Sequence, residues 1–137
     1  MQKHTTLNLS QIPDAAKNIA HKLRGGEVLA LIGELGSGKT AFARALAKRL
    51  KVKNRITSPT FVLMNIFRGL LPKNKKKIML FHLDLYRTKN ISEVRALGIT
   101  DLWGKKDAVV LIEWADKIKK YLPPNAIMIH FTHGSQN

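Results

Sequence analysis

The sequence contains no cysteine, which excludes disulfide frameworks, thiolate zinc sites and a cysteine nucleophile. It also lacks an apolar run long enough to span a bilayer, and its first five residues do not begin the apolar stretch of a signal peptide. From these absences we expect a cytoplasmic protein that makes no membrane contact.

Acidic residues are scarce, since 9 Asp and Glu stand against 24 Lys and Arg, for a formal net charge of +15. Such a surplus favours polyanions such as RNA, because neutralising phosphates releases counterions. The basic residues are concentrated in Lys48 to Arg55, Lys73 to Lys77, Lys105-Lys106 and Lys117 to Lys120. Two interpretations stay open: a solvated basic surface that favours solubility, or direct contact with a nucleic acid or an acidic protein.

The length of 137 residues and the apolar content of 45% are typical of one compact globular domain. No internal repeat or linker divides the chain, so we expect a single domain over residues 1–137. The patterning predicts a strand at 5–9, a helix at 12–23, a buried strand at 28–32 and a helix at 40–50. Later expected segments are a strand at 60–67, a lysine-rich hairpin tip at 71–77, apolar runs at 78–85 and 108–112, a helix at 91–97 and a last ordered piece at 126–131.

Residues Gly33 to Thr40 satisfy the Walker A pattern, in which a glycine and four further residues precede Gly-Lys-Ser/Thr. The pattern sits between a predicted buried strand and a predicted helix. Its glycines allow backbone amides to point inward as an anion nest at the positive end of that helix. Lys39 can then reach the β- and γ-phosphates, and the Thr40 hydroxyl can ligate magnesium. A glycine-rich turn that only connects a strand to a helix would satisfy the full Walker A pattern by chance in about one in a few hundred chains of this length.

Phosphate hydrolysis also needs a carboxylate that organises magnesium or the attacking water. Val109 to Glu113 has the Walker B form of apolar residues followed by an acid, and Leu80 to Asp84 is a looser version interrupted by His82. Either acid alone could be an ordinary strand-end residue that faces solvent. Next to a phosphate loop, however, both Asp84 and Glu113 become candidate catalytic residues.

A series of motifs makes the chain similar to the TsaE family. The motifs occur in the family's order: Gly33 to Thr40, Ser58-Pro59-Thr60-Phe61, His82-Leu83-Asp84-Leu85-Tyr86-Arg87, Leu97-Gly98 and Ile112-Glu113-Trp114. The resemblance extends from about Ser10 to Trp114 and is weakest after Asp116. This series is far more specific than the Walker A pattern alone.

The resemblance implies an α/β fold: a P-loop NTPase-like three-layer sandwich with a mixed, mainly parallel central sheet flanked by helices. It also implies magnesium-dependent ATP hydrolysis that is weak in the isolated monomer and stimulated by partners. Those partners would be homologues of TsaB and TsaD, with tRNA contacted within the complex. In this interpretation hydrolysis resets the TsaB–TsaD complex during N6-threonylcarbamoyladenosine modification of tRNA.

The family's site residues transfer onto matching positions. Lys39, Asp84 and Glu113 are the expected catalytic residues, and Thr40 and Glu113 the expected magnesium ligands, with Asp84 organising the water or the magnesium shell. The expected nucleotide contacts are Glu34, Leu35, Gly36, Ser37, Gly38, Lys39, Thr40, Ala41, Thr60 and Trp114. Thr60 matches the Thr of a switch-like loop.

Simpler roles compete with some of these assignments. Thr60 could be a plain strand former, Trp114 a core aromatic and His82 a packed strand residue. Tyr86 and Arg87 could clamp the site, meet a partner or make a structural hydrogen bond.

Departures from the family pattern include Glu34 in place of a common Asp, Ala115 in place of a frequent Pro, and a short segment after Phe131. Among other functions, a GTPase is disfavoured because the Asn-Lys-x-Asp element is missing. A small-molecule kinase and a basic RNA-binding module with a structural nucleotide remain the alternatives.

Overall fold

The computed structural model describes residues 2–53, 64–88, 91–96 and 98–133, and the predicted site residue Thr60 lies outside these ranges. The strands are β1 (Lys3–Leu7), β2 (Val28–Ile32), β3 (Met64–Leu70), β4 (Lys77–Asp84), β5 (Ala108–Glu113) and β6 (Ile127–Phe131). The α-helices are α1 (Ile12–Lys22), α2 (Lys39–Arg49) and α3 (Ile91–Ala96), and the 3-10 helices are η1 (Leu9–Gln11), η2 (Ile99–Leu102) and η3 (Ala115–Tyr121).

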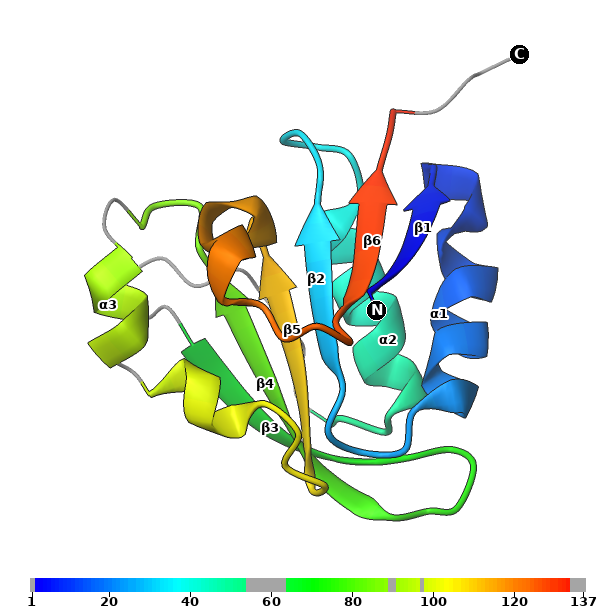
Figure 1. The fold of residues 1–137 in the computed structure, drawn as a ribbon. Helices are drawn as coiled ribbons and strands as arrows, with labels where there is room; N and C mark the ends of the chain where they lie inside the picture. The colour runs from blue at the N-terminus through cyan, green and yellow to red at the C-terminus, as the bar shows by residue number, and fades with distance from the viewer. Residues whose placement is uncertain (1, 54–63, 89–90, 97, 134–137) are drawn as a thin grey trace.

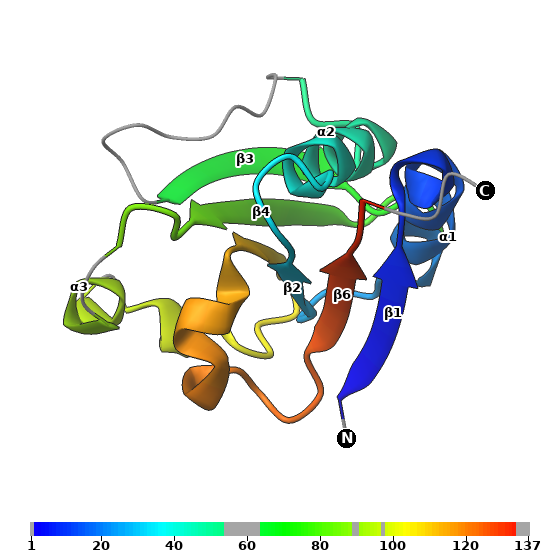
Figure 2. The same cartoon turned by 90° about the horizontal axis from the view of Figure 1, so that it is seen from above.

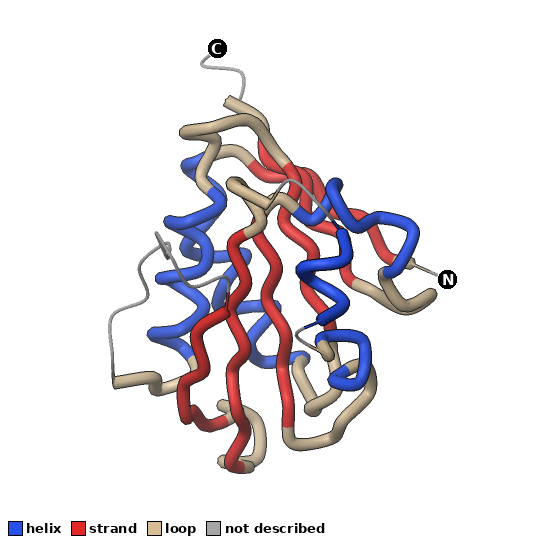
Figure 3. Tube along the Cα trace, turned by 90° about the vertical axis from the view of Figure 1, so that its left-hand side faces the viewer, coloured by secondary structure: helices blue, strands red, loops and turns tan. Residues whose placement is uncertain are grey.

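The strands form one 6-stranded sheet in the order β1-β6-β2-β5-β4-β3 (Figure 1). All neighbouring pairs are parallel except β3 and β4, which form an antiparallel hairpin. Helices α1 and α2 cover one face, whereas α3, η2 and η3 cover the other (Figures 2 and 3). The expected mixed, mainly parallel sheet with flanking helices is therefore confirmed.

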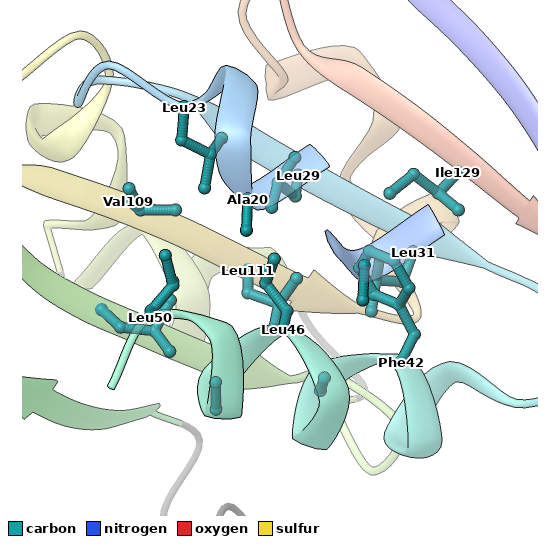
Figure 4. Close-up of a cluster of buried hydrophobic side chains, with 14 of the residues drawn as sticks. Ala20, Leu23, Leu29, Leu31, Phe42, Leu46, Leu50, Val109, Leu111 and Ile129 are labelled. Atoms are coloured by element: carbon teal, nitrogen blue, oxygen red, sulfur yellow. The ribbon is translucent and has the colours of Figure 1, made fainter. Parts of the chain in front are cut away.

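The apolar run at 28–32 is explained by burial on both faces of the sheet, as a central parallel strand requires. Leu29 and Leu31 pack toward α2, while Val28 and Ala30 join the cluster on the opposite face. Figure 4 shows Leu29 and Leu31 in one cluster with Ala20 of α1 and with Phe42 and Leu46 of α2. Each fully buried leucine or phenylalanine side chain contributes about 1.5–3 kcal/mol of transfer free energy. This packing fixes the start of α2 against the end of β2.

Most expected elements occur within a few residues of their predicted bounds, and two shift. The sequence pattern predicts the first strand at 5–9, but β1 ends at Leu7 because the Asn8 amide donates to Gln11 Oε1 (2.9 Å) and a 3-10 turn begins at Leu9. The strand expected at 60–67 continues to Leu70 within the described residues, so the lysine-rich turn joins β3 directly to β4.

Because β2, β5 and β4 are parallel neighbours, their carboxyl ends lie side by side at the same end of the sheet. In the strand register Glu113 lies opposite both Leu31 of β2 and Asp84 of β4. The loop that follows β2 therefore opens beside the two acids that were singled out as candidates. None of the helices in the described ranges combines the length and apolarity that a bilayer-crossing segment needs.

Candidate nucleotide-binding site

The loop between β2 and α2 depends on glycine for its shape. Gly36 and Gly38 have φ values of +79° and +116°, a region that residues with a Cβ rarely adopt. A Cβ on Gly38 would lie 2.7 Å from Ile12 Cδ1, and one on Gly33 would lie 2.6 Å from Ser37 Oγ. The loop thus leads tightly into α2, whose first amides have no partner within the helix. Such a helix start is a ready site for an anion.

Lys39 is the first residue of α2 and is only 4% exposed. Its ammonium donates hydrogen bonds to Gly33 O (2.5 Å) and Glu34 O (2.8 Å), and it lies 3.9 Å from the centroid of the Trp114 ring. Burial lowers its pKa below the ordinary value. Neighbouring carboxylates partly oppose that shift of the Lys39 pKa: Glu113, Asp116, Asp84 and Glu34.

Glu113, at the end of β5, is 2% exposed and is held from two sides. Its Oε1 accepts a hydrogen bond from Thr40 Oγ1 (2.9 Å), and its Oε2 lies 2.7 Å from His82 Nε2. The two residues predicted to ligate magnesium are therefore in direct contact, one from α2 and one from β5. A hydroxyl beside a carboxylate supplies the oxygen ligands that magnesium prefers.

Asp84 ends β4 beside Glu113 and is almost fully buried. Its Oδ1 accepts the Tyr86 backbone amide (3.0 Å), which turns the chain at the end of the strand. Within the described ranges no group of three or more His, Asp or Glu side chains is arranged to hold a metal alone.

An aromatic wall closes one side of the site. Trp114 follows Glu113 with a left-handed backbone (φ 61°), and its ring packs against that of Tyr86 with centroids 5.0 Å apart. Lys117 stabilises this wall, since its ammonium donates to the carbonyls of Tyr86 and Thr88. Trp114 also packs against the apolar cluster on the α3 face. It therefore serves the core and contacts Lys39 at the same time.

A cavity of about 360 Å³ lies among these groups. The predicted site residues that line it are Leu35, Gly36, Gly38, Lys39, Thr40, Ala41, Asp84, Glu113 and Trp114. Sequence reasoning did not assign Leu9 to the site, although it also lines the cavity, because nothing in the sequence signals that the turn after β1 reaches the phosphate loop. Tyr86, considered only as a possible clamp, is part of the lining as well.

Two of the predicted contacts, Glu34 and Ser37, do not line this cavity. The Glu34 side chain is exposed and lies 3.5 Å from His133 Nε2, away from the cavity lining. Ser37 belongs to the loop, but its hydroxyl is buried and has no hydrogen-bond partner among the described residues. His82 is a packed strand residue, as the simpler interpretation held, and it additionally contacts Glu113. A larger groove at the opposite end of the sheet contains none of the predicted site residues.

Comparisons with known proteins agree on one family. The family model described as "Threonylcarbamoyl adenosine biosynthesis protein TsaE" matches residues 6–137. The chain is 34% identical to the TsaE protein of Rickettsia prowazekii, over 93% of this chain and 83% of that protein. It is 35% identical to that of Bacillus subtilis, over 93% and 75%, and 39% identical to that of Aquifex aeolicus, over 76% and 69%.

Among solved structures, the crystal structure of Bacillus subtilis YdiB is similar, with a TM-score of 0.64 and 28% identity over 95% of this chain and 75% of that chain.

Proposed function

The chain belongs to the TsaE family, and from this premise we propose that it is a magnesium-dependent ATPase of tRNA threonylcarbamoyladenosine biosynthesis. The observation that carries the proposal is the Thr40–Glu113 contact beside the buried Lys39 ammonium. Together they gather an anion-binding helix start, a cation and a carboxylate around one cavity. This combination suits a nucleoside triphosphate and its metal ion.

In the proposed mechanism, the amides at the start of α2 bind the β-phosphate and Lys39 stabilises charge on the β- and γ-phosphate oxygens. Thr40 and Glu113 would hold magnesium, which supplies further neutralisation of phosphate charge when bound. Asp84 is the second acid at this edge and orients the attacking water or the magnesium shell. Trp114 would help to position the Lys39 ammonium through the ring contact.

The proposal places this ATPase in the cytoplasm, as a monomer with weak turnover that associates with TsaB and TsaD homologues. Hydrolysis would reset their complex between rounds of tRNA modification, and Thr60 would contact the nucleotide. Family membership supports the pathway, and the acids beside the phosphate loop support hydrolysis.

The decisive experiment measures ATP turnover by this protein with and without a purified TsaB–TsaD pair and an unmodified tRNA transcript. We expect the partners to raise turnover, and we expect Lys39→Ala and Glu113→Ala to remove most of it. If the partners change nothing, or if multiple-turnover modification continues without this protein, the proposed role is wrong.

Two further measurements separate the alternative functions from the proposed one. A small-molecule kinase would phosphorylate a member of a metabolite panel faster than it hydrolyses ATP. In an RNA-binding module with a structural nucleotide, Lys39→Ala would leave both nucleotide binding and tRNA modification intact.

A further inference from the structure

At the end of the sheet opposite the phosphate loop, the surface carries a basic groove. A depression of about 900 Å³ is lined by the exposed cations Lys51, Lys53, Arg68 and Lys77. Lys51 and Lys53 follow α2, Arg68 lies on β3, and Lys77 starts β4. We call this depression, with these four cations, the basic groove. Cations from segments far apart in the sequence thus line one depression.

Further lysines extend this charge beyond the groove. Lys73, Lys75 and Lys76 belong to the β3–β4 turn, and Lys105 and Lys106 precede β5. Lys76 Nζ donates to Lys106 O (2.7 Å), which ties the two turns together. Figure 1 shows this turn and the phosphate loop at opposite ends of the sheet. Residues 51–53, 73–77 and 105–106 of the basic segments noted in the sequence therefore lie at one end of the molecule.

Among the described residues, the cations of the basic groove are not paired with carboxylates. Asp107 is the acid among the lining residues. Four further acids lie near Lys39 at the other end of the sheet: Glu34, Asp84, Glu113 and Asp116. Glu27, before β2, lies at the same end as the groove, where its carboxylate accepts the Arg24 and Gly25 amides.

A backbone hydrogen bond joins the two sides of the groove, and apolar residues contribute to its lining. The Leu70 amide donates to Leu50 O (2.6 Å), which joins β3 to the end of α2. A Cβ on Gly69 would lie 2.7 Å from Leu50 O, so glycine permits this close approach. Ile66 and Phe67 contribute apolar surface to the lining, and Ile66 is 49% exposed. Apolar and aromatic surface between cations is suited to nucleobases and ribose.

We propose that the basic groove binds the phosphate backbone of an RNA. Repeated phosphates complement cations that come from several segments, and their neutralisation releases counterions. The choice of RNA over another polyanion rests on the proposed role in tRNA modification. Helix α2 separates this site from the phosphate loop by roughly 15 Å, the rise of its length at 1.5 Å per residue. RNA and nucleotide therefore bind at different ends of the protein.

The test measures binding of the full chain to a fluorescently labelled, unmodified tRNA transcript by anisotropy, over a range of salt concentrations. The groove variant combines Lys53→Gln, Arg68→Gln and Lys77→Gln, all at exposed positions. A control variant with the same loss of charge combines Lys3→Gln, Lys17→Gln and Lys120→Gln, which are also exposed but lie outside the groove. Circular dichroism checks that both fold, and the single Arg68→Gln and Lys77→Gln changes replace the triple variant if it does not.

We expect the groove variant to lose at least about tenfold in RNA affinity at physiological salt, and the control to lose less than about threefold. The slope of log K against log salt concentration should also become shallower by about 0.7–0.9 per phosphate contact removed. Equal losses in both variants, or no loss in either, overturn the proposal. Retained RNA affinity with lost binding of a TsaB–TsaD pair would make the groove a protein interface, which also overturns it.

Nucleotide binding by the same variants separates this proposal from the proposed ATPase function. The groove variant should bind magnesium and ATP as the parent does, because the phosphate loop lies at the other end of α2. If Lys39→Ala abolishes ATP binding but leaves RNA binding intact, the two sites are independent. If the parent binds RNA through the groove yet hydrolyses no ATP, only the proposed ATPase function fails.

Discussion

His82 Nε2 lies 2.7 Å from Glu113 Oε2, so a buried imidazole of β4 holds the carboxylate at the end of β5. Both side chains are almost inaccessible, at 0% and 2% exposure. The other carboxylate oxygen accepts the hydroxyl hydrogen of Thr40. Glu113 is thereby fixed between the sheet and the start of α2, and its orientation depends on a residue that does not line the cavity.

Replacing His82 tests this dependence. We expect His82→Leu to lower magnesium-dependent ATP turnover by about 10- to 100-fold, the usual effect of losing a residue that orients a metal ligand. His82→Gln, which retains a hydrogen-bond donor, should recover part of the activity. ATP binding measured without magnesium should change less than about twofold in both. Turnover, and ATP affinity with and without magnesium, are the measurements.

His21→Gln, at an exposed position of α1, is the matched control and should keep parental turnover. Parental magnesium dependence in His82→Leu would show that Glu113 does not need the imidazole.

The two strand-end acids should have separable effects. Glu113→Gln removes the charge beside Thr40 and is expected to raise the magnesium concentration needed for half-maximal turnover at least tenfold. Asp84→Asn should instead lower the maximal rate by about 100-fold or more, within the usual range for a group that assists proton transfer, with a smaller change in magnesium requirement. Magnesium titrations of ATP turnover measure both. If Asp84→Asn raises the magnesium requirement and Glu113→Gln lowers the maximal rate, the two roles are exchanged. Asp14→Asn, at an exposed position of α1, is the control.

Trp114 should contribute to nucleotide affinity through Lys39. Its ring lies 3.9 Å from the ammonium, and a cation–π contact of this kind is worth about 0.5–2 kcal/mol. Trp114→Leu should therefore weaken ATP binding by roughly 2- to 30-fold, while Trp114→Phe should weaken it less. Titration calorimetry gives the affinities.

Trp103 provides the control for tryptophan fluorescence, because its indole donates to Tyr121 O instead of facing Lys39. A fluorescence change on adding magnesium and ATP should persist in Trp103→Phe and disappear in Trp114→Phe. Loss of the signal in Trp103→Phe alone would contradict the placement of Trp114 at the site.

Stability in mild acid should depend on His130. Burial, then the neighbouring His4 and Lys119, lower the pKa of His130 below 6.5. In the pH range below 6.5 the unfolded chain then binds more protons than the folded one, so the free energy of unfolding falls as the pH falls. His130→Gln should show a shallower fall between pH 7 and 5 in urea titrations. An unchanged slope would contradict this, and His21→Gln should follow the parent.

The local patterns in the sequence predicted the phosphate loop and its flanking elements. The loop needs glycines and a lysine at fixed spacing, and α2 needs Phe42, Leu46 and Leu50 four residues apart, so both are encoded over short distances. The acids could be found because each ends an apolar run. Their adjacency follows once the strands are parallel neighbours, with Asp84 opposite Glu113.

Contacts that depend on register or tertiary packing were not visible in the sequence. The pairing of His82 with Glu113 requires the alignment of β4 with β5, which neither strand specifies alone. Leu9 reaches the cavity only because α1 packs against α2. The basic groove likewise depends on the hydrogen bond that joins β3 to the end of α2.

The strand register of Asp84 and Glu113 also constrains how this chain can change in length. Side chains alternate between the faces of a strand, so one residue inserted within β4 would turn Asp84 to the opposite face. The turn at residues 71–76 can lengthen or shorten without moving either carboxylate, because it joins the far ends of β3 and β4. Over evolutionary time, insertions and deletions should therefore accumulate in that turn and be rare within β4 and β5, which end in the two acids.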